Sequence, residues 1–140
     1  MSAATEVKLW LRLRGCPDHV IEDGLPGLIQ RWEEVAADCE RGYRSGLDDW
    51  LDDLDARQLL FEAAQEIPAA MNESLDQRLA SADARFERVT RRDSECVWGA
   101  DVAQENGWSA QVEWWYWCVP LIPGEELAEE LGLAGPSDDL

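Results

Sequence analysis

The stretch from Gln111 to Pro120, QVEWWYWCVP, decides which fold class the sequence predicts. It contains four consecutive aromatic residues, and the pair Asn106-Gly107 lies shortly before it. Asn-Gly between runs of strand-forming residues is a strong signal for the two-residue turn of a β-hairpin. We therefore expect an antiparallel β-hairpin in the C-terminal third of the chain.

The predicted second strand has two aromatic faces, because side chains alternate along a strand. Trp115 and Trp117 lie on one face, and Trp114 and Tyr116 lie on the other. The register places Trp98 opposite Trp115. A two-stranded hairpin is marginal in water, so one face must pack on helices. We expect Trp114 and Tyr116 to stay uncovered and contact a partner; the alternative is that both faces are core.

Three long amphipathic helices are predicted before the hairpin. Their apolar residues recur at intervals of three and four, which is the helical period, over residues 26–43, 47–67 and 72–89. Near Asp55 the apolar stripe changes phase, which indicates an irregularity or a helix that packs against two neighbours. Asn72 is the expected N-cap of the third helix.

Shorter elements are predicted at both ends of the chain. Residues 5–14 fit either a short strand or a fraying helix, because apolar and polar residues alternate there. One or two helical turns should follow Pro17 and stop at Gly24. The acidic segment 123–132 predicts a last short helix that ends at Gly132.

Together these patterns predict a mainly helical α+β fold with three main helices, a C-terminal antiparallel β-hairpin and a short terminal helix. A chain of 140 residues has the size of one domain and can bury about two-thirds of its unfolded surface. We expect a single domain over residues 1–140. Its parts would be a helical region of about 16–92, the hairpin and acidic region of about 93–134, and a frayed tail at 135–140.

The charge of the chain is strongly negative and unevenly distributed. The net charge is −18, and the segment from Asp93 to Leu140 has eleven acidic residues and no Lys or Arg. Nucleic acids and anionic membranes are bound through cationic side chains, so we expect neither as a partner. A basic protein is the natural complement to such a surface. The alternative is that the acidic residues only keep the protein in solution.

The segment 46–57, GLDDWLDDLDAR, concentrates acidic side chains on one predicted helix. The residues concerned are Asp48, Asp49, Asp52, Asp53 and Asp55. Like charges four residues apart on a helix repel each other by about 0.2–0.5 kcal/mol per pair, although Arg44 and Arg57 are placed to offset some of this. We interpret the cluster as a docking surface for a basic partner. The alternatives are a solvated helix face, a divalent metal site and a buried Asp–Arg network with Arg85.

Residues for catalysis or metal binding are sparse. His19 is the only histidine, and although Cys16 has ligand-like spacing to it, no second pair completes a zinc site. We therefore predict no metal and no cofactor. We expect the four cysteines to be free thiols, with Cys96 and Cys118 on opposite hairpin faces. No catalytic motif is present, so we predict a protein that is not an enzyme.

The resulting functional hypothesis is a small acidic cytoplasmic protein-interaction module, specifically an inhibitor or immunity-type protein that neutralises a basic partner. The expected location follows from the lack of an apolar signal-peptide core or of a stretch of roughly 18 apolar residues. One alternative is a structural or regulatory homodimer that uses an exposed aromatic face. Another is a small-ligand binder or enzyme with a Trp-lined pocket beside Glu113.

Overall fold

The computed structural model describes residues 1–132, and these residues form six α-helices, two short 3-10 helices and one two-stranded sheet. The predicted frayed tail, residues 135–140, lies outside the described residues. In chain order the elements are α1 (Ala3–Leu13), α2 (Asp18–Arg41), α3 (Leu47–Glu66), η1 (Pro68–Ala70), α4 (Glu73–Arg88), β1 (Thr90–Arg92), α5 (Ala100–Asn106), η2 (Trp114–Trp117), β2 (Cys118–Pro120) and α6 (Glu125–Glu130).

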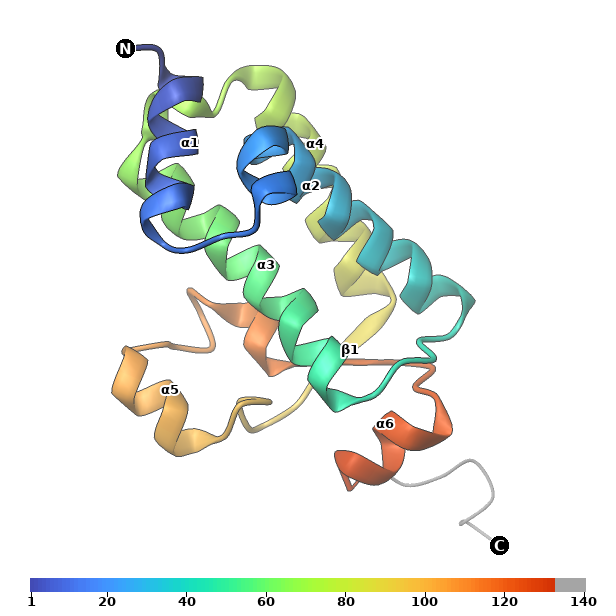
Figure 1. Ribbon diagram of the computed structural model, residues 1–140. Coiled ribbons are helices and arrows are strands. Elements are labelled where there is room, and N and C mark those ends of the chain that lie inside the picture. Colours follow the sequence, from blue (N-terminus) through green and yellow to red (C-terminus); the bar gives the residue numbers. More distant parts are fainter. Residues whose placement is uncertain (133–140) are drawn as a thin grey trace, which may run out of the picture.

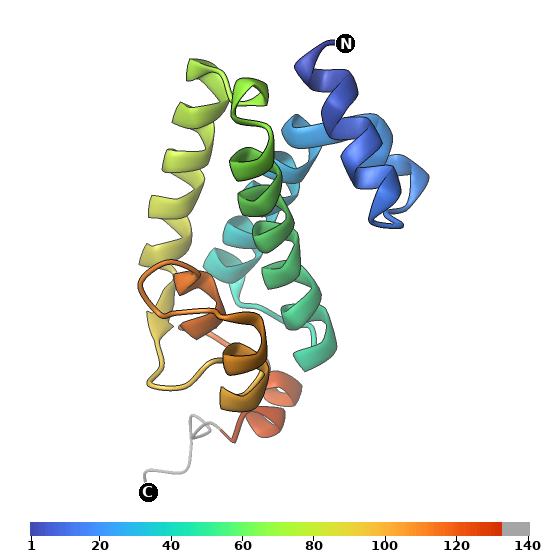
Figure 2. The same cartoon turned by 90° about the vertical axis from the view of Figure 1, so that its left-hand side faces the viewer.

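The three long predicted helices are present as α2, α3 and α4, which lie side by side, with α1 packed against the upper end of α2 (Figures 1 and 2). Asn72 is the N-cap of α4, as expected, because its Oδ1 accepts a hydrogen bond from the Leu75 backbone N–H at 2.8 Å. The alternating N-terminal segment is helical, and Val7 and Leu11, one turn apart, are its buried side chains.

Helix α2 is two helical segments joined at a kink. Gly24 has φ 62° and ψ −152°, which L-residues with side chains rarely adopt, so the expected stop at Gly24 is confirmed as a break in helical geometry. Pro26 lies in the first turn of the segment that follows, where its missing N–H leaves no helical hydrogen bond unmade.

The apolar stripe of α3 changes phase because the two halves of the helix pack into different clusters of buried residues. Trp50 and Leu54 belong to a lower cluster of buried residues shared with the aromatic side chains. Leu60 and Ala63 belong to an upper cluster formed with α1 and the first part of α2. Because α3 runs unbroken from Leu47 to Glu66, the alternative of a helix with two neighbours is the correct one.

The hairpin turn at Asn106-Gly107 is not formed, and this prediction was wrong. Asn106 is the last residue of α5, and Gly107 follows it in the left-handed conformation, with φ 70° and ψ 25°. Its N–H bonds back to the carbonyl groups of Ala103 and Gln104, which closes the helix. An Asn-Gly pair provides positive φ for a hairpin turn or for a helix end, and the local sequence does not distinguish the two uses.

An antiparallel pair of strands does exist, but its members differ from those expected. β1 follows α4 directly and pairs with β2, so that Thr90 faces Pro120 and Arg92 faces Cys118. The expected register of Trp98 opposite Trp115 was therefore wrong. Helices α5 and η2 lie in the connection between the two strands (Figure 1).

The C-terminal third, as far as residue 132, closes the lower end of the helical bundle (Figure 2). Its Trp115 and Tyr116 are fully buried in the same cluster as Trp32, Trp50 and Phe86 from the long helices. Aromatic side chains of this size bury roughly 150–250 Å² each, so they dominate the hydrophobic contribution to stability here. All four cysteines are free thiols, as predicted.

Candidate functional site

The predicted aspartate cluster lies in the first half of α3, and the structure divides it into two groups. Asp48, Asp49 and Asp52 are exposed. Asp53 and Asp55 are half-buried, because the helix turns them toward neighbouring elements.

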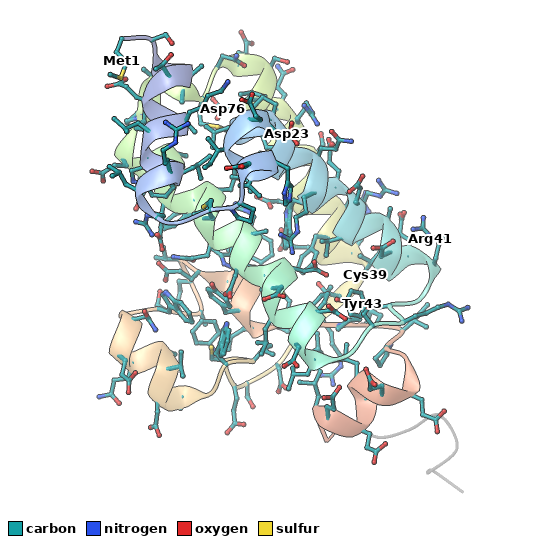
Figure 3. All side chains as sticks on the ribbon, viewed as in Figure 1. Met1, Asp23, Cys39, Arg41, Tyr43 and Asp76 are labelled. Atoms are coloured by element: carbon teal, nitrogen blue, oxygen red, sulfur yellow. The ribbon has the colours of Figure 1, made fainter. Side chains whose placement is uncertain are left out.

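Asp53 is tied to the loop that precedes α3. Its Oδ2 accepts a hydrogen bond from the Tyr43 hydroxyl at 2.7 Å, and its Oδ1 accepts one from Arg31 Nη2 at 3.2 Å. Tyr43 is buried and lies with Cys39 near the lower end of α2, whereas Arg41 lies at the periphery (Figure 3). Burial raises the pKa of Asp53 against the opposing effect of these hydrogen bonds. Asp53 therefore accepts hydrogen bonds within the fold and is not a freely exposed charge.

Asp55 links α3 to the C-terminal third. Its Oδ1 accepts hydrogen bonds from the Tyr116 hydroxyl at 2.7 Å and from Trp98 Nε1 at 3.1 Å. Burial raises the pKa of Asp55, although both hydrogen bonds favour the charged form. The same contact raises the pKa of the Tyr116 hydroxyl, for which burial is the larger cause. Asp55 is thus a structural acceptor and not a freely exposed charge.

Helix α6 packs against the start of α3 and brings more acidic side chains to it. The cap position of α3 is Gly46, which has no side chain to cap the helix. Glu130 Oε1 supplies the missing acceptor and takes a hydrogen bond from the Leu47 N–H at 2.9 Å. The Glu126 carboxylate lies so close to Gly46 that a Cβ atom there would collide with it. Carboxylates at a helix N-terminus are stabilised by the helix dipole.

This packing brings exposed carboxylates of α6 beside the start of α3, and we call the two sets together the acidic face. It consists of the exposed residues Asp48, Asp49, Asp52, Glu125, Glu126, Glu129 and Glu130. None of the ion pairs found among residues 1–132 includes a member of it. Arg44 and Arg57, which the sequence placed near the aspartates, make no ion pair with Asp48 or Asp53 in the described residues.

The aromatic run is not arranged as expected. Trp114–Trp117 forms the 3-10 helix η2, whose three residues per turn put Trp114 and Trp117 on the same side. These two side chains are half-buried, whereas Trp115 and Tyr116 are each 1% exposed. The expectation that Tyr116 is uncovered was therefore wrong. Trp114 packs against Phe86, with ring centroids 6.0 Å apart.

A buried Asp–Arg network exists, but its members are not the ones suggested by the sequence. Arg57 is 6% exposed, and its Nε and Nη2 donate to the two carboxylate oxygens of Asp83 at 3.0 and 2.9 Å. Trp32 Nε1 donates to the same Asp83 at 2.8 Å. Arg85 pairs with Glu40 on the surface instead. In the sequence, the one signal for this network was the position of Arg57. Helical spacing places it within the apolar stripe of α3.

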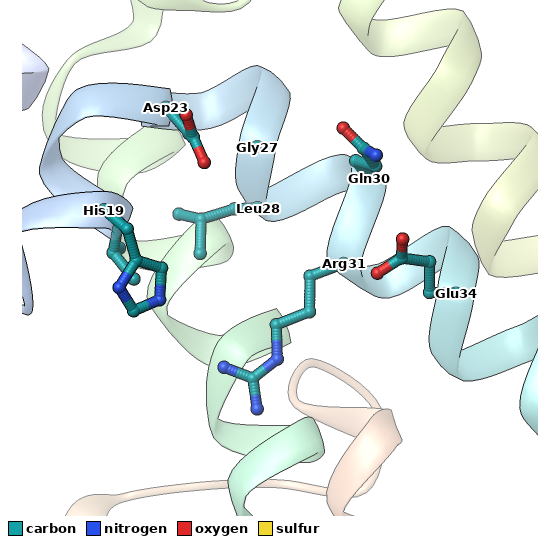
Figure 4. Close-up of a pocket in the computed structure, with 8 residues that line it drawn as sticks. His19, Asp23, Gly27, Leu28, Gln30, Arg31 and Glu34 are labelled. Carbon is teal, nitrogen blue, oxygen red and sulfur yellow. The ribbon is translucent and has the colours of Figure 1, made fainter.

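The single histidine lies in a small hollow beside the kink of α2 (Figure 4). His19 and Asp23 come from the segment before the kink, and Arg31 and Glu34 come from the helix after it. The hollow has a volume of about 270 Å³. Within residues 1–132, no three His, Cys, Asp or Glu side chains gather closely enough to hold a metal ion.

Comparison with known proteins gives no relative for this chain. No model of a known protein family matches it, and neither a curated protein nor a solved structure matches it. In the described part of the chain, no helix is both long enough and apolar enough to cross a membrane. The function therefore has to be inferred from the residues and contacts described above.

Proposed function

We propose that the chain is a cytoplasmic protein-interaction module that binds a basic protein through the acidic face, as an inhibitor or immunity-type protein does. One observation carries the proposal. The Leu47 N–H and Glu130 are 83 residues apart in the sequence, yet they are hydrogen-bonded, so α6 adds its glutamates to the exposed aspartates of α3.

The electrostatics of the acidic face support a cationic partner. Its seven carboxylates repel each other, and no Lys or Arg in residues 1–132 pairs with them. The segment from residue 133 onward contains no Lys or Arg in its sequence either. A basic protein would relieve this repulsion, and the long-range attraction would speed its association.

The alternative functions have less support. The homodimer hypothesis requires an exposed aromatic face, but Tyr116 is buried inside the monomer. The small-ligand binder or enzyme would use a Trp-lined pocket with the Glu113 carboxylate beside it. Glu113 instead accepts a hydrogen bond from the Ser109 N–H at 2.9 Å, which places it at the start of η2.

The test compares two triple variants that change the net charge equally. The first is Asp48→Asn/Asp49→Asn/Asp52→Asn on the acidic face. The control is Glu34→Gln/Glu66→Gln/Glu105→Gln, which neutralises exposed residues on α2, α3 and α5. Each immobilised protein is incubated with lysate of its own cells, and captured proteins are identified by mass spectrometry.

We expect the unmodified chain and the control to capture the same basic protein and the acidic-face variant to lose it. Affinity should also fall as salt rises, because the Debye length shortens from about 10 Å at 0.1 M to about 3 Å at 1 M. Equal capture by both triple variants, or affinity that does not change with salt, would overturn the proposal.

A further inference from the structure

A shallow groove with aromatic walls lies where α3 meets α5, and nothing above assigns a role to it. Its volume is about 380 Å³. We call it the aromatic groove and define it by Asp55, Gln58, Glu62, Trp98, Trp108 and Tyr116. The acidic face leads toward it along α3, because Asp52 and Asp55 are three residues apart and lie on neighbouring turns.

The walls of the aromatic groove are held in fixed positions. The ring of Trp108 stacks on that of Tyr116, with centroids 4.0 Å apart and an angle of 14° between the planes. The Tyr116 hydroxyl and Trp98 Nε1 both donate to Asp55 Oδ1. Trp98 is nevertheless 37% exposed, so part of a well-anchored indole ring faces solvent. Exposed indole faces attract cations through the ring quadrupole.

The one basic side chain at the groove is already engaged. Arg14 Nη1 lies 2.6 Å from Glu62 Oε1, and its guanidinium lies over the ring of Trp10, 4.1 Å from the centroid. Asp55, by contrast, forms no ion pair with any residue in 1–132. Its Oδ2 accepts no hydrogen bond from those residues and is not one of their buried unpaired atoms, so it is open to a donor from a partner.

Gln58, which also lines the groove, has a buried oxygen without a hydrogen-bond partner in the described residues. The residue is 8% exposed, and its Nε2 donates to Glu62 Oε2 at 2.8 Å. Because a carboxylate can only accept, this bond fixes the orientation of the amide and leaves Oε1 as the group without a partner among the described residues. Because this oxygen is itself buried, a donor in the groove reaches it only if the Gln58 side chain moves.

We propose that the aromatic groove holds an arginine side chain of a protein partner. A guanidinium group is planar, stacks on aromatic faces and presents several N–H donors in a fixed arrangement, which matches an exposed indole beside the open carboxylate oxygen of Asp55. Lysine carries the same charge but lacks a planar group with several N–H donors in a fixed arrangement. That the arginine belongs to a basic protein rests on the function proposed above; the preference for a guanidinium rests on the groove alone.

The proposal is tested on the full chain with a small probe, acetyl-Gly-Arg-Gly-amide. Its binding is followed by NMR through the indole N–H signals of Trp98 and Trp108. A matched peptide carries citrulline, which has the same shape as arginine without the charge. We expect the arginine peptide to shift both signals with a dissociation constant on the order of millimolar, and the citrulline peptide to bind about tenfold more weakly.

Two variants locate the probe in the aromatic groove. Trp98→Leu removes the exposed ring, and Asp55→Asn removes the acceptor charge; each should weaken binding of the arginine peptide about tenfold. Glu105→Gln removes one charge from an exposed position on α5 and should leave binding unchanged. If Asp55→Asn fails to fold, Trp98→Leu decides the question. Equal binding of the two peptides, or no effect of Trp98→Leu, would overturn the proposal.

The acidic-face triple variant separates this inference from the proposed function. It keeps every residue that defines the groove but neutralises Asp52, one turn from Asp55, so at about 0.15 M salt it should weaken binding of the arginine peptide by less than Asp55→Asn does. Peptide binding that persists while the partner experiment fails would refute the proposed function alone. Capture of a basic protein with no discrimination between the peptides would refute the groove alone.

Discussion

Asp52 and Asp53 are neighbours in the sequence, but the direction in which α3 turns their side chains gives them different roles. Asp52 is exposed, whereas Asp53 accepts hydrogen bonds from Tyr43 and Arg31. Two half-buried carboxylates on α3 thus hold tyrosine hydroxyl groups in place, because Asp55 does the same for Tyr116. At the scale of single residues, burial decides whether an acidic side chain stabilises the fold or is available to a partner.

The Arg57–Asp83 pair is the residue-scale feature on which stability should depend most. Asp83→Ala leaves the Arg57 guanidinium buried without its counterion, so we expect the free energy of unfolding to fall by about 3 kcal/mol. Urea denaturation followed by tryptophan fluorescence measures this. Arg85→Ala, which removes a pair exposed on the surface, should change stability little. Equal losses in the two variants would contradict the prediction.

At the scale of elements, packing decided whether Asn106-Gly107 forms a hairpin turn or the end of a helix. Gly107 needs its positive φ in either case, so the glycine alone carries no information about which element precedes it. The distinction depends on whether residues 100–106 find a place to pack, and Ala103 is the side chain that α5 buries. Packing on the body of the protein therefore selects the helix.

Substitutions at this pair distinguish the two structures experimentally. Gly107→Ala should lower the free energy of unfolding by about 1 kcal/mol, since a left-handed conformation is costly with a Cβ atom. No atom lies within 4 Å of a Cβ built there, so the cost is one of backbone conformation. Asn106→Ala, in the last turn of an exposed helix, should change stability by less than about 0.5 kcal/mol.

Chemical denaturation of both variants provides the measurement. In a hairpin turn of type I′ both central residues have positive φ, so both substitutions would be costly. A loss for Asn106→Ala as large as that for Gly107→Ala would therefore argue for the turn and against α5.

At the scale of the whole molecule, the C-terminal third completes the core that the long helices begin. Trp50 from α3 donates its Nε1–H to the Cys118 carbonyl at 3.2 Å, and both residues are buried. The rings of Trp50 and Phe86 stack at 5.8 Å beside them. The lower half of the bundle should therefore unfold together with β2, because neither can bury its apolar surface without the other.

The reactivity of the four thiols tests whether the cysteines are buried as the structure shows. Cys39, Cys96 and Cys118 are buried, and burial, with smaller contributions from Asp53 and Asp38, raises the pKa of Cys39 to about 12. At neutral pH an aromatic disulfide reagent should modify Cys16 first, because it is the partly exposed thiol. The other three should react only after unfolding in guanidinium chloride.

The Cys16→Ser variant serves as the control for this measurement. It should lack the early phase of thiol release and keep the late one. Rapid modification of a second cysteine under native conditions would contradict the burial of the C-terminal third against the helices.

The sequence alone predicted the features that depend on neighbours within one or two turns. The three long helices, the N-cap at Asn72 and the break at Gly24 follow from apolar spacing and from residues with special backbone preferences. The expectation of a two-stranded antiparallel sheet was also correct, although of the expected strands only the end of the second, Cys118–Pro120, is part of it. These features depend on residues three or four positions apart, so they can be predicted from the sequence.

Only the tertiary structure decided how segments that are far apart in the sequence pack against each other. It paired β1 with β2 across the intervening helices α5 and η2, turned Trp114–Trp117 into a 3-10 helix, and buried Tyr116 against Asp55. It also set α6 beside the start of α3, which joined two separate acidic segments into the acidic face. Such contacts depend on which surfaces meet when the chain collapses. The free energy of burying aromatic side chains decides that outcome and overrides weak local preferences for strand or turn.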